Sequence, residues 1–397
     1  MKFIGIVLGG DMNSYGVCRA FYEKYKIKTI ILGQRPLFFV KYSKLTDCYF
    51  NENILDSNVL IEELTKIDKL YPDTKKILFS NTDYYVKLMI YNKDKILNIS
   101  SNFIVPTIDF KLFDTLFNKD TFYELCEKYN ITYPKSIIFD LKKDKSTKFK
   151  MPFSYPIFLK PANTDVYSRL DFAGRQKGYK INSQEEFIET IDYIQKYYDG
   201  KFIIQEYIES YDDDMYVYTF YCNSNSKVEV ATGGKILMHD RSPKLVGNYN
   251  AICNTYNEEL CLELKEFLEK IKFTGICHFD IIYDRKRNKY VVLEINIRQG
   301  RSNYYTLASG VNLASFIVDD YIYHQDKKFE IANQEFTVSI LPKFVLKYFL
   351  KKNHEQVKIK NFHRFCLAKY DFNLIRCIYH LRWDYHILRD YIKYNKN

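Results

Sequence analysis

The sequence has no apolar run long enough to cross a membrane, since no stretch approaches the roughly 20 apolar residues that a spanning helix needs. The opening MKFIGIVLGG is a short apolar run that passes directly into a glycine turn, so a secretory signal is not expected. The nine cysteines are odd in number and include no CxxC pair, which argues against a disulfide framework and a zinc site. These absences predict a cytoplasmic protein with reduced thiols.

Glycine and proline are also scarce, with 14 Gly and 9 Pro among 397 residues, and no Pro/Gly-rich linker, internal repeat or low-complexity segment is visible. A composition that is 47% hydrophobic and 17% aromatic is ample for packed cores. The length favours two or three packed units. The lack of linkers predicts that these units lie close together.

The net charge of +10 is unevenly distributed along the chain. Between Leu341 and Asn397 there are 13 Lys+Arg and 4 Asp+Glu, so this tail carries +9. Its stretch HLRWDYHILRDYIKY has apolar and aromatic residues at helical spacing with basic residues between them. Three interpretations are a basic helix on a membrane surface, a nucleic-acid arm, and a helix packed on the body with a solvated basic face. The usual frequency of such helices favours the last, and no nucleic-acid partner is expected.

The N-terminal part alternates strands with helices. KFIGIVLGGD is typical of a buried parallel strand that turns on Gly9-Gly10 into a helix, and KTIILG and KKILFSNTD follow as further strands, which predicts an α/β layer. Glycines after a first strand can admit a phosphate to a helix N-terminus. GGDMNSYG is not GxGxxG, however, so a tight turn or a site for a different ligand is favoured over a dinucleotide site.

Further along, the pattern predicts a long helix over residues 109–131, a strand at YPIFLKP (155–161), a polar glycine-containing loop and a helix over 185–198. KFIIQEYIES, MYVYTFYC and VEVATGGKI follow as strands, with a helix over 258–271. The stretch FDIIYDRKRNKYVVLEINIR then has the form of a hairpin, with a loop at 284–288.

The second strand of this hairpin carries polar residues in the middle of an apolar run. Side chains alternate faces along a strand, so Glu294, Asn296 and Arg298 should share one face. Leu293, Ile295 and Ile297 should then pack on the other face.

The hairpin register brings a second carboxylate to this polar face. If Asp284 pairs with Tyr290, then Ile282 lies opposite Val292 and Asp280 opposite Glu294. Directly opposed residues have Cβ atoms about 4.5–5.5 Å apart, where two carboxylates repel unless a cation lies between them. The side-chain oxygens of Asp, Glu and Asn are suitable ligands for Mg²⁺. Arg298, the next residue on the same face, could bind a phosphate or a carboxylate. The alternative is an edge strand with solvated charges or a structural Asp–Arg pair.

The order of features along the chain, from two lysines through a glycine loop and QEYI to FD…LEINIR, resembles the ATP-grasp superfamily of carboxylate–amine ligases over about residues 1–335. The resemblance implies an α/β (α+β ATP-grasp) fold. Its expected parts are a Rossmann-like pre-ATP-grasp domain (1–110), a first ATP-grasp lobe with a phosphate lid (111–205), a second lobe with a Mg²⁺ site (206–335) and a basic helical C-terminal extension (336–397).

The resemblance also implies roles for particular residues, with ATP and Mg²⁺ as cofactors. Lys119 and Lys160 would hold the nucleotide phosphates, and Lys160 and Arg298 would act in catalysis, Arg298 by stabilising the acyl-phosphate transition state. The remaining assignments are the lid (Gly174, Arg175, Gln176, Lys177, Gly178), the adenine contacts (the Gln205 side chain and the backbones of Glu206 and Ile208), the ribose contact (Asp212 or Asp213) and the Mg²⁺ ligands (Asp280, Glu294, Asn296). The lid is longer and less glycine-rich than in many members.

Three stretches, IVLGGDMNSYGVCRAFYEKY, SRLDFAGRQKGYKI and VGNYNAI, resemble the D-aspartate ligases within this superfamily. Such enzymes join the β-carboxylate of D-aspartate to the lysine ε-amine of a peptidoglycan precursor, so an anionic muramyl-peptide acceptor is implied. The basic C-terminal extension adds a possible peripheral membrane contact. Candidate substrate contacts are Lys235, His239, Arg241 and Arg301. Alternatives are a ligase that forms a dipeptide or modifies a surface polysaccharide, and a non-catalytic nucleotide-binding module.

Overall fold

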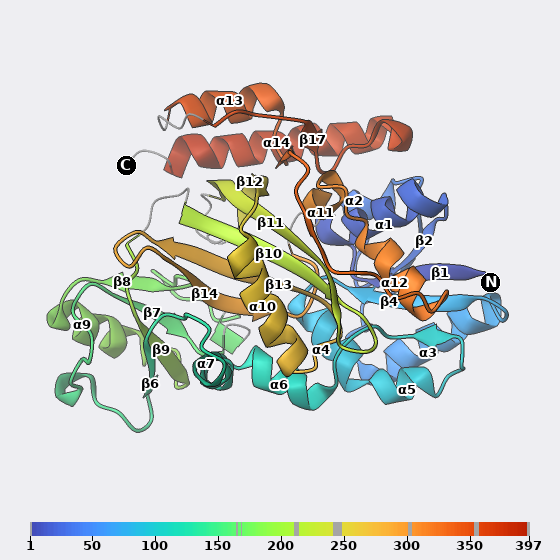
Figure 1. Cartoon of the computed structure of the whole chain (residues 1–397). Helices are drawn as coiled ribbons and strands as arrows, with labels where there is room; N and C mark the ends of the chain where they lie inside the picture. The colour runs from blue at the N-terminus through green and yellow to red at the C-terminus, as the bar shows by residue number, and fades with distance from the viewer. Residues whose placement is uncertain are drawn as a thin grey trace.

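The computed structural model describes residues 2–163, 166–167, 169–209, 214–240, 248–300, 304–352 and 357–394. These residues form three sheets with helices packed around them (Figure 1). All nine cysteines are free thiols, in agreement with the prediction of no disulfide framework. Among the described residues, no helix combines the length and the apolar character needed to span a membrane.

The N-terminal sheet is parallel, with the strand order β3-β2-β1-β4-β5. Its strands are β1 (Phe3–Leu8), β2 (Thr29–Gly33), β3 (Thr46–Phe50), β4 (Lys75–Ser80) and β5 (Phe103–Ile104), and its helices are α1 (Met12–Tyr25), α2 (Phe38–Lys41), α3 (Ser57–Leu70), α4 (Asp83–Tyr91) and α5 (Lys93–Leu97). Every residue of β1 is buried, as expected for a parallel strand covered on both faces.

The turn after β1 is the tight turn that the sequence favours. Gly9 has φ +111°, a conformation that residues with a Cβ rarely adopt. Asp11 follows as the N-cap of α1, and its side chain accepts a hydrogen bond from the Ser14 backbone N–H (2.9 Å). The turn therefore leads directly into α1, and the Asp11 side chain satisfies one of the backbone N–H donors in the first turn of that helix.

The middle of the chain forms a four-stranded antiparallel sheet with the order β6-β9-β7-β8. Its strands are β6 (Ser136–Asp140), β7 (Ile157–Pro161), β8 (Tyr179–Ile181) and β9 (Lys201–Glu206), with the 3₁₀ turn η1 (Ser146–Lys148). Helix α9 (Gln184–Ile194) packs Phe187, Ile191 and Ile194 against one face. Strand β6, which the sequence analysis did not anticipate, forms the edge beside β9.

The predicted long helix over 109–131 is wrong in one respect, because it is two helices, α6 (Phe110–Phe117) and α7 (Lys119–Lys128). The break is at Asn118, which has an extended backbone with ψ 122°. The Asn118 side-chain amide donates to the Asp114 carbonyl (2.8 Å), so it competes locally with the helical backbone. As a result Lys119 is the first residue of α7.

The largest sheet has eight strands, in the order β14-β13-β10-β11-β12-β16-β17 with β15 beside β11. Its strands are β10 (Met215–Cys222), β11 (Val228–His239), β12 (Tyr249–Thr255), β13 (Gly275–Asp284), β14 (Lys289–Asn296), β15 (Glu330–Ala332), β16 (Thr337–Ser339) and β17 (Phe362–Arg364). Helix α10 (Glu258–Lys270) packs on one face, while α11 (Tyr304–Ala308) and α12 (Leu313–Tyr321) belong to the core that includes α1.

The C-terminal tail is part of this assembly. It contributes β17 to the large sheet, and it adds α13 (Lys343–Lys352), the 3₁₀ turn η3 (Lys369–Asp371) and α14 (Leu374–Tyr394). The buried carboxylate of Asp371 accepts hydrogen bonds from the hydroxyls of Tyr15 (2.7 Å) and Ser43 (2.9 Å) and forms an ion pair with the buried Arg376. The prediction that the tail packs on the body is therefore confirmed.

Candidate active site

The hairpin of β13 and β14 lies between the four-stranded sheet and the N-terminal sheet (Figure 1). Asp280 lies directly opposite Glu294, as predicted. Toward the turn the register shifts by one residue, so that Ile281–Val292, Ile282–Val291 and Asp284–Lys289 pair in place of the predicted Ile282–Val292 and Asp284–Tyr290.

The shift arises because Leu293 has no partner across the hairpin, which makes it the extra residue of a β-bulge. Contacts from a distant segment hold this bulge. The Leu293 carbonyl accepts a hydrogen bond from the Tyr123 hydroxyl (2.9 Å), and the Val292 N–H donates to the Thr132 carbonyl (2.8 Å). The bulge therefore ties the hairpin to helix α7 and the segment after it.

The polar face of β14 is formed as the alternation predicts. The Asn296 amide N–H donates to Asp280 Oδ2 (3.0 Å), and the Arg298 guanidinium donates to Asn296 Oδ1 (3.3 Å). Ile295 and Ile297 are buried on the other face. These contacts bring the acidic, amide and guanidinium groups together in one cluster.

The two lysines flank the carboxylates of the hairpin. Lys119 forms an ion pair with Glu294 Oε2. Desolvation, and then the positive charge of Lys119, hold the pKa of Lys160 well below its usual value. The attraction of Lys119 in turn lowers the pKa of Glu294. Lys119, Lys160 and Glu294 therefore form one interacting group, in which two lysines share one carboxylate.

Asp280 is electrostatically strained in the absence of a cation. Desolvation, and then the negative charge of Glu294, raise the pKa of Asp280 to about 7. Among the described residues, no group of three or more His, Cys, Asp or Glu side chains could hold a metal on its own. Two carboxylates and an amide oxygen fit Mg²⁺, since Mg²⁺ is commonly held by one or two carboxylates with substrate phosphates completing its shell.

Two further residues complete this cluster, and neither was found from the sequence. Asp83, at the start of α4, accepts a hydrogen bond from Arg298 Nε (2.6 Å). His278 Nδ1 lies 2.9 Å from the Arg298 carbonyl, and because a carbonyl only accepts, this nitrogen carries the proton. Desolvation lowers the pKa of His278 to about 4, so the ring is neutral at pH 7. The alternation of β13 could have indicated His278, two residues before Asp280.

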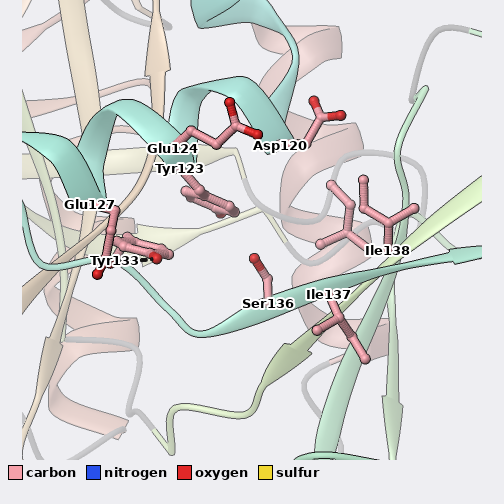
Figure 2. A pocket seen from close by; sticks show the side chains of 9 residues that line it. Asp120, Tyr123, Glu124, Glu127, Tyr133, Ser136, Ile137 and Ile138 are labelled. Atoms are coloured by element: carbon pink, nitrogen blue, oxygen red, sulfur yellow. Dashed lines mark hydrogen bonds between the residues drawn. The ribbon is translucent and has the colours of Figure 1, made fainter.

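A cavity of about 420 Å³ lies between α7 and the four-stranded sheet, and its lining includes none of the side chains of this cluster. Figure 2 shows helix α7 above it, with the carboxylates of Asp120 and Glu124, and strand β6 below it. The full lining is Asp120, Tyr123, Glu124, Glu127, Tyr133, Ser136, Ile137, Ile138 and Ile203.

The strand register relates this cavity to Lys160. Ile203 pairs with both Lys160 and Ile138, so the three side chains share one face of the sheet. The cavity therefore has its apolar floor on the face that carries Lys160 and its roof on the helix that begins with Lys119.

Comparisons with known proteins were made at the level of sequence and of structure. No family model matches the chain. A D-aspartate ligase of Enterococcus faecium (strain Aus0004) is 35% identical over 330 residues, which cover 82% of this chain and 78% of that protein. The chain belongs to the D-aspartate ligase family.

Solved structures of ATP-grasp enzymes share the fold of this D-aspartate ligase family member. An L-amino acid ligase from Bacillus licheniformis has a TM-score of 0.57 at 11% identity, with 80% of this chain and 74% of that chain covered. The biotin carboxylase domain of the Hydrogenobacter thermophilus 2-oxoglutarate carboxylase has a TM-score of 0.60 at 14% identity, with 82% and 71% covered. The predicted ATP-grasp fold is confirmed, and the chain is an ATP-dependent ligase that forms carbon–nitrogen bonds.

The expected adenine contacts of this D-aspartate ligase family member lie at the end of β9. The buried Gln205 side chain donates to the Tyr123 hydroxyl (2.7 Å), next to the cavity. The Glu206 backbone N–H donates to the Lys135 carbonyl (3.0 Å), so this N–H is already occupied. Adenine would have to contact a different group of Glu206. Ile208 is half-buried just beyond the strand.

The expected lid leads from β7 to β8. Gly174 has φ +73° and open space where a Cβ would lie, while a Cβ on Gly178 would clash with the Phe158 ring. The Gln176 backbone N–H donates to the Tyr179 hydroxyl (3.1 Å). Arg175 closes a local turn through its N–H to the Phe172 carbonyl (3.3 Å).

Lys177 is the lid residue that acts on the carboxylate cluster. After the larger causes given above, its charge also lowers the pKa of Lys160 and of Glu294, and it opposes the rise in the pKa of Asp280. The structure therefore brings one cation of the lid toward the hairpin.

The remaining candidates are less closely connected to this cluster. Lys235 pairs with Tyr216 on β10, whereas Asp280 pairs with the adjacent Val217, so Lys235 projects from the opposite face of the sheet. His239 is half-buried at the end of β11. Asp212, Asp213, Arg241 and Arg301 lie outside the described residues.

Proposed function

We propose that the chain activates the β-carboxylate of D-aspartate with ATP and joins it to the lysine ε-amine of an anionic muramyl-peptide precursor. The observation that carries this proposal is the opposed Asp280–Glu294 pair, flanked by Lys119, Lys160 and Arg298. A protein that only bound a nucleotide would have no use for two facing carboxylates, which are costly without a cation between them. The choice of D-aspartate rests on the 35% identical relative.

The reaction needs a carboxylate oxygen to attack the γ-phosphate of ATP, after which an amine displaces phosphate from the acyl phosphate. In such a transfer, positioning and charge stabilisation do most of the work. Asp280, Glu294 and the Asn296 amide would hold Mg²⁺, and when bound the metal neutralises charge on the phosphates. The residues of the chain then have to bind and orient the two reacting groups.

The two lysines are suited to holding phosphate oxygens. Burial, and then repulsion by Lys119, lower the pKa of Lys160. An anionic phosphate between the two lysines would offset their repulsion and favour the charged form of both.

Arg298 is suited to orienting the acyl phosphate. Its guanidinium is planar and can donate two parallel hydrogen bonds to a phosphate or carboxylate. Asp83 holds it from the N-terminal unit, and Asn296 accepts from it on the side of the metal ligands. The arginine would therefore be fixed before substrate arrives, which reduces the entropy cost of reaching the transition state.

The cavity beside Gln205 supports a place for the nucleoside. Its floor of Ile138 and Ile203 and its wall of Tyr123 suit a flat ring, as small-molecule sites are mostly apolar with a few polar groups. The carboxylates of Asp120 and Glu124 would repel phosphates and accept hydrogen bonds from hydroxyl or amino groups. This arrangement favours the base and ribose in the cavity and the phosphates at the lysine pair.

Hydroxamate formation tests this proposal directly. The purified chain would be incubated with Mg-ATP, hydroxylamine and each of a panel of D- and L-amino acids, with ADP release and hydroxamate measured together. We expect ADP and hydroxamate with D-aspartate and not with L-aspartate. Hydroxamate with a different acid would keep the ligase chemistry and overturn the substrate.

The muramyl-peptide acceptor is tested in a second reaction. The chain, Mg-ATP and D-aspartate would be supplied with a muramyl-pentapeptide precursor, and the product mass measured. Addition of one aspartyl residue to the precursor lysine is expected, and an acetylated lysine in the precursor should abolish it. Addition at any other amine would overturn the assignment of the acceptor.

A further inference from the structure

The outward face of the C-terminal helices exposes large apolar side chains from one end of α14 to the other. On α14, a stripe of residues is exposed at Leu374, Ile378, Leu381, Tyr385 and Ile392, with between 60% and 68% of each residue accessible. On α13, Phe344 and Tyr348 are exposed by 74% and 64%. Single exposed apolar residues are normal, but a continuous stripe of them marks an interaction surface.

The opposite face of α14 is fixed to the body, so the stripe cannot turn inward. Arg376, His380, Ile387 and Tyr391 are buried on that face. The Tyr391 ring contacts Phe349 of α13 (5.0 Å between ring centroids), and the two helices lie side by side along one edge of the molecule (Figure 1). The outward orientation of the stripe is therefore set by the packing of the helix.

The charges on this face all have one sign. The exposed charged residues on the described parts of α13 and α14 are Lys343, Lys347, Lys351, Arg382, Arg389 and Lys393. The acidic residues of the two helices, Asp384 and Asp390, are largely shielded and pair with Arg364 and Arg389. The surface is thus apolar and basic, which differs from the solvated basic face expected from the sequence.

We propose that α13 and α14 bind the headgroup region of an anionic lipid membrane. Exposed apolar side chains between basic residues are the pattern of a helix that lies in the plane of such an interface. With 21 residues α14 is long enough to reach across a bilayer, but it is not apolar enough to do so. This proposal goes beyond the ligase activity and does not rest on it.

A second copy of the chain fits the same face less well. The apolar stripe has spacings of four and three residues, which is also the pattern of a helix–helix seam. A symmetric partner, however, would bring the same lysines and arginines against one another, without exposed acidic groups on the described parts of these helices to pair with them. Charge complementarity therefore favours an anionic lipid surface over self-association.

Vesicle sedimentation with the full chain tests the proposal. Vesicles of phosphatidylcholine alone would be compared with vesicles that also contain phosphatidylglycerol, at low and high salt. We expect binding to the anionic vesicles, weakened by salt because part of the attraction is electrostatic. No binding to anionic vesicles would overturn the proposal.

Two variants separate the apolar from the electrostatic contribution. Leu381→Ser with Tyr385→Ser should weaken binding at least about tenfold, since both side chains would lose apolar contact with lipid. Arg382→Gln with Lys393→Gln should weaken it about 25-fold on anionic vesicles, from a factor of about five for each basic residue. Leu70→Ser, at an equally exposed position on α3, is the matched control and should bind like the wild type.

Two controls distinguish lipid binding from unfolding and from self-association. The variants should keep the wild-type thermal unfolding midpoint and the wild-type rate of hydroxamate formation, because the substituted side chains are exposed and distant from the carboxylate hairpin. Sedimentation velocity without lipid should give a monomer. A dimer that Leu381→Ser dissociates, with no vesicle binding, would assign the face to a second copy and overturn the lipid proposal.

Discussion

Replacing Glu294 by glutamine removes the negative charge at the centre of the candidate site while keeping the shape of the side chain. In the structure this carboxylate pairs with Lys119, lies opposite Asp280 and interacts with the charge of Lys160. The substitution therefore removes one attraction and one repulsion at the same time. We expect a large loss of turnover with a small change in stability.

The two opposing contributions can be compared. Losing the charged hydrogen bond to Lys119 costs about 1.5–3 kcal/mol. Two carboxylates about 5 Å apart repel by roughly 3 kcal/mol at an effective dielectric constant of about 20. The pKa of Asp280 is about 7, so near pH 7 about half of that repulsion is present. The free energy of unfolding of Glu294→Gln should therefore fall by no more than about 1.5 kcal/mol.

The effect on catalysis should be much larger. On the proposed assignment the variant loses a charged metal ligand, and it also loses the anion that pairs with Lys119. A deficit of about 4 kcal/mol in transition-state stabilisation corresponds to about a thousandfold loss of turnover. ADP release and hydroxamate formation with saturating Mg-ATP would measure this loss, and urea unfolding would measure the stability.

Glu63→Gln is the matched control. Glu63 also pairs with a lysine, Lys66, but on the surface of α3, where such a pair contributes little. It should keep full turnover and nearly full stability. A Glu294→Gln variant that turned over within tenfold of the wild type would refute the assignment of this residue to the metal and phosphate site.

Three further changes test other contacts. Asp83→Asn should lower turnover about tenfold and the free energy of unfolding by no more than about 1.5 kcal/mol, since one charged hydrogen bond to Arg298 is worth about 1.5 kcal/mol; steady-state kinetics would show whether kcat falls, and urea unfolding would measure the stability. Arg376→Leu should lower the free energy of unfolding by about 3–5 kcal/mol, because it leaves the carboxylate of Asp371 buried without its cation, and urea unfolding would measure this. Burial lowers the pKa of His380 from 6.5 to about 3. Below pH 6.5 the unfolded state therefore binds a proton that the folded state does not bind, so the free energy of unfolding falls as the pH drops. Between pH 8 and pH 5 the wild type should lose about 2 kcal/mol more than His380→Phe, as measured by paired urea titrations.

The polar face of β14 could be predicted because it depends only on local alternation. Period-two placement puts Glu294, Asn296 and Arg298 together whatever the rest of the chain does. The opposed Asp280 was derived from an Asp284–Tyr290 pairing that the structure does not form, and the Asp280–Glu294 pairing is right because the bulge at Leu293 restores the predicted register beyond it. The bulge at Leu293 could not be predicted, since Tyr123 and the segment after α7 hold it from more than a hundred residues away.

The contacts that were missed join segments far apart in the sequence. Asp83 meets Arg298 across 215 residues, and no local pattern marks Asp83 as different from other acidic residues at helix starts. Strand β6 was missed for a related reason, because its SIIFD run is short and becomes a strand by pairing with β9. Such long-range pairs can be predicted from a single sequence only when both partners lie in regular elements of known register.

In the C-terminal tail the local pattern was clear enough to predict the helix, but it did not show which side of the helix would be buried. The helix was predicted, yet apolar residues of α14 occur on more than one side, so periodicity alone could not say which side is buried. The structure buries the side with Arg376 and His380, because Asp371 and the hydroxyl of Tyr15 pair with that arginine inside the fold. Burying a cation in place of leucines has a cost in desolvation that the ion pair only partly offsets. The fold therefore buries Arg376 and leaves Leu381 and Ile392 exposed, although the opposite orientation would avoid the desolvation cost. This orientation keeps an apolar face on the surface of the molecule, and the vesicle experiment tests whether that face binds lipid.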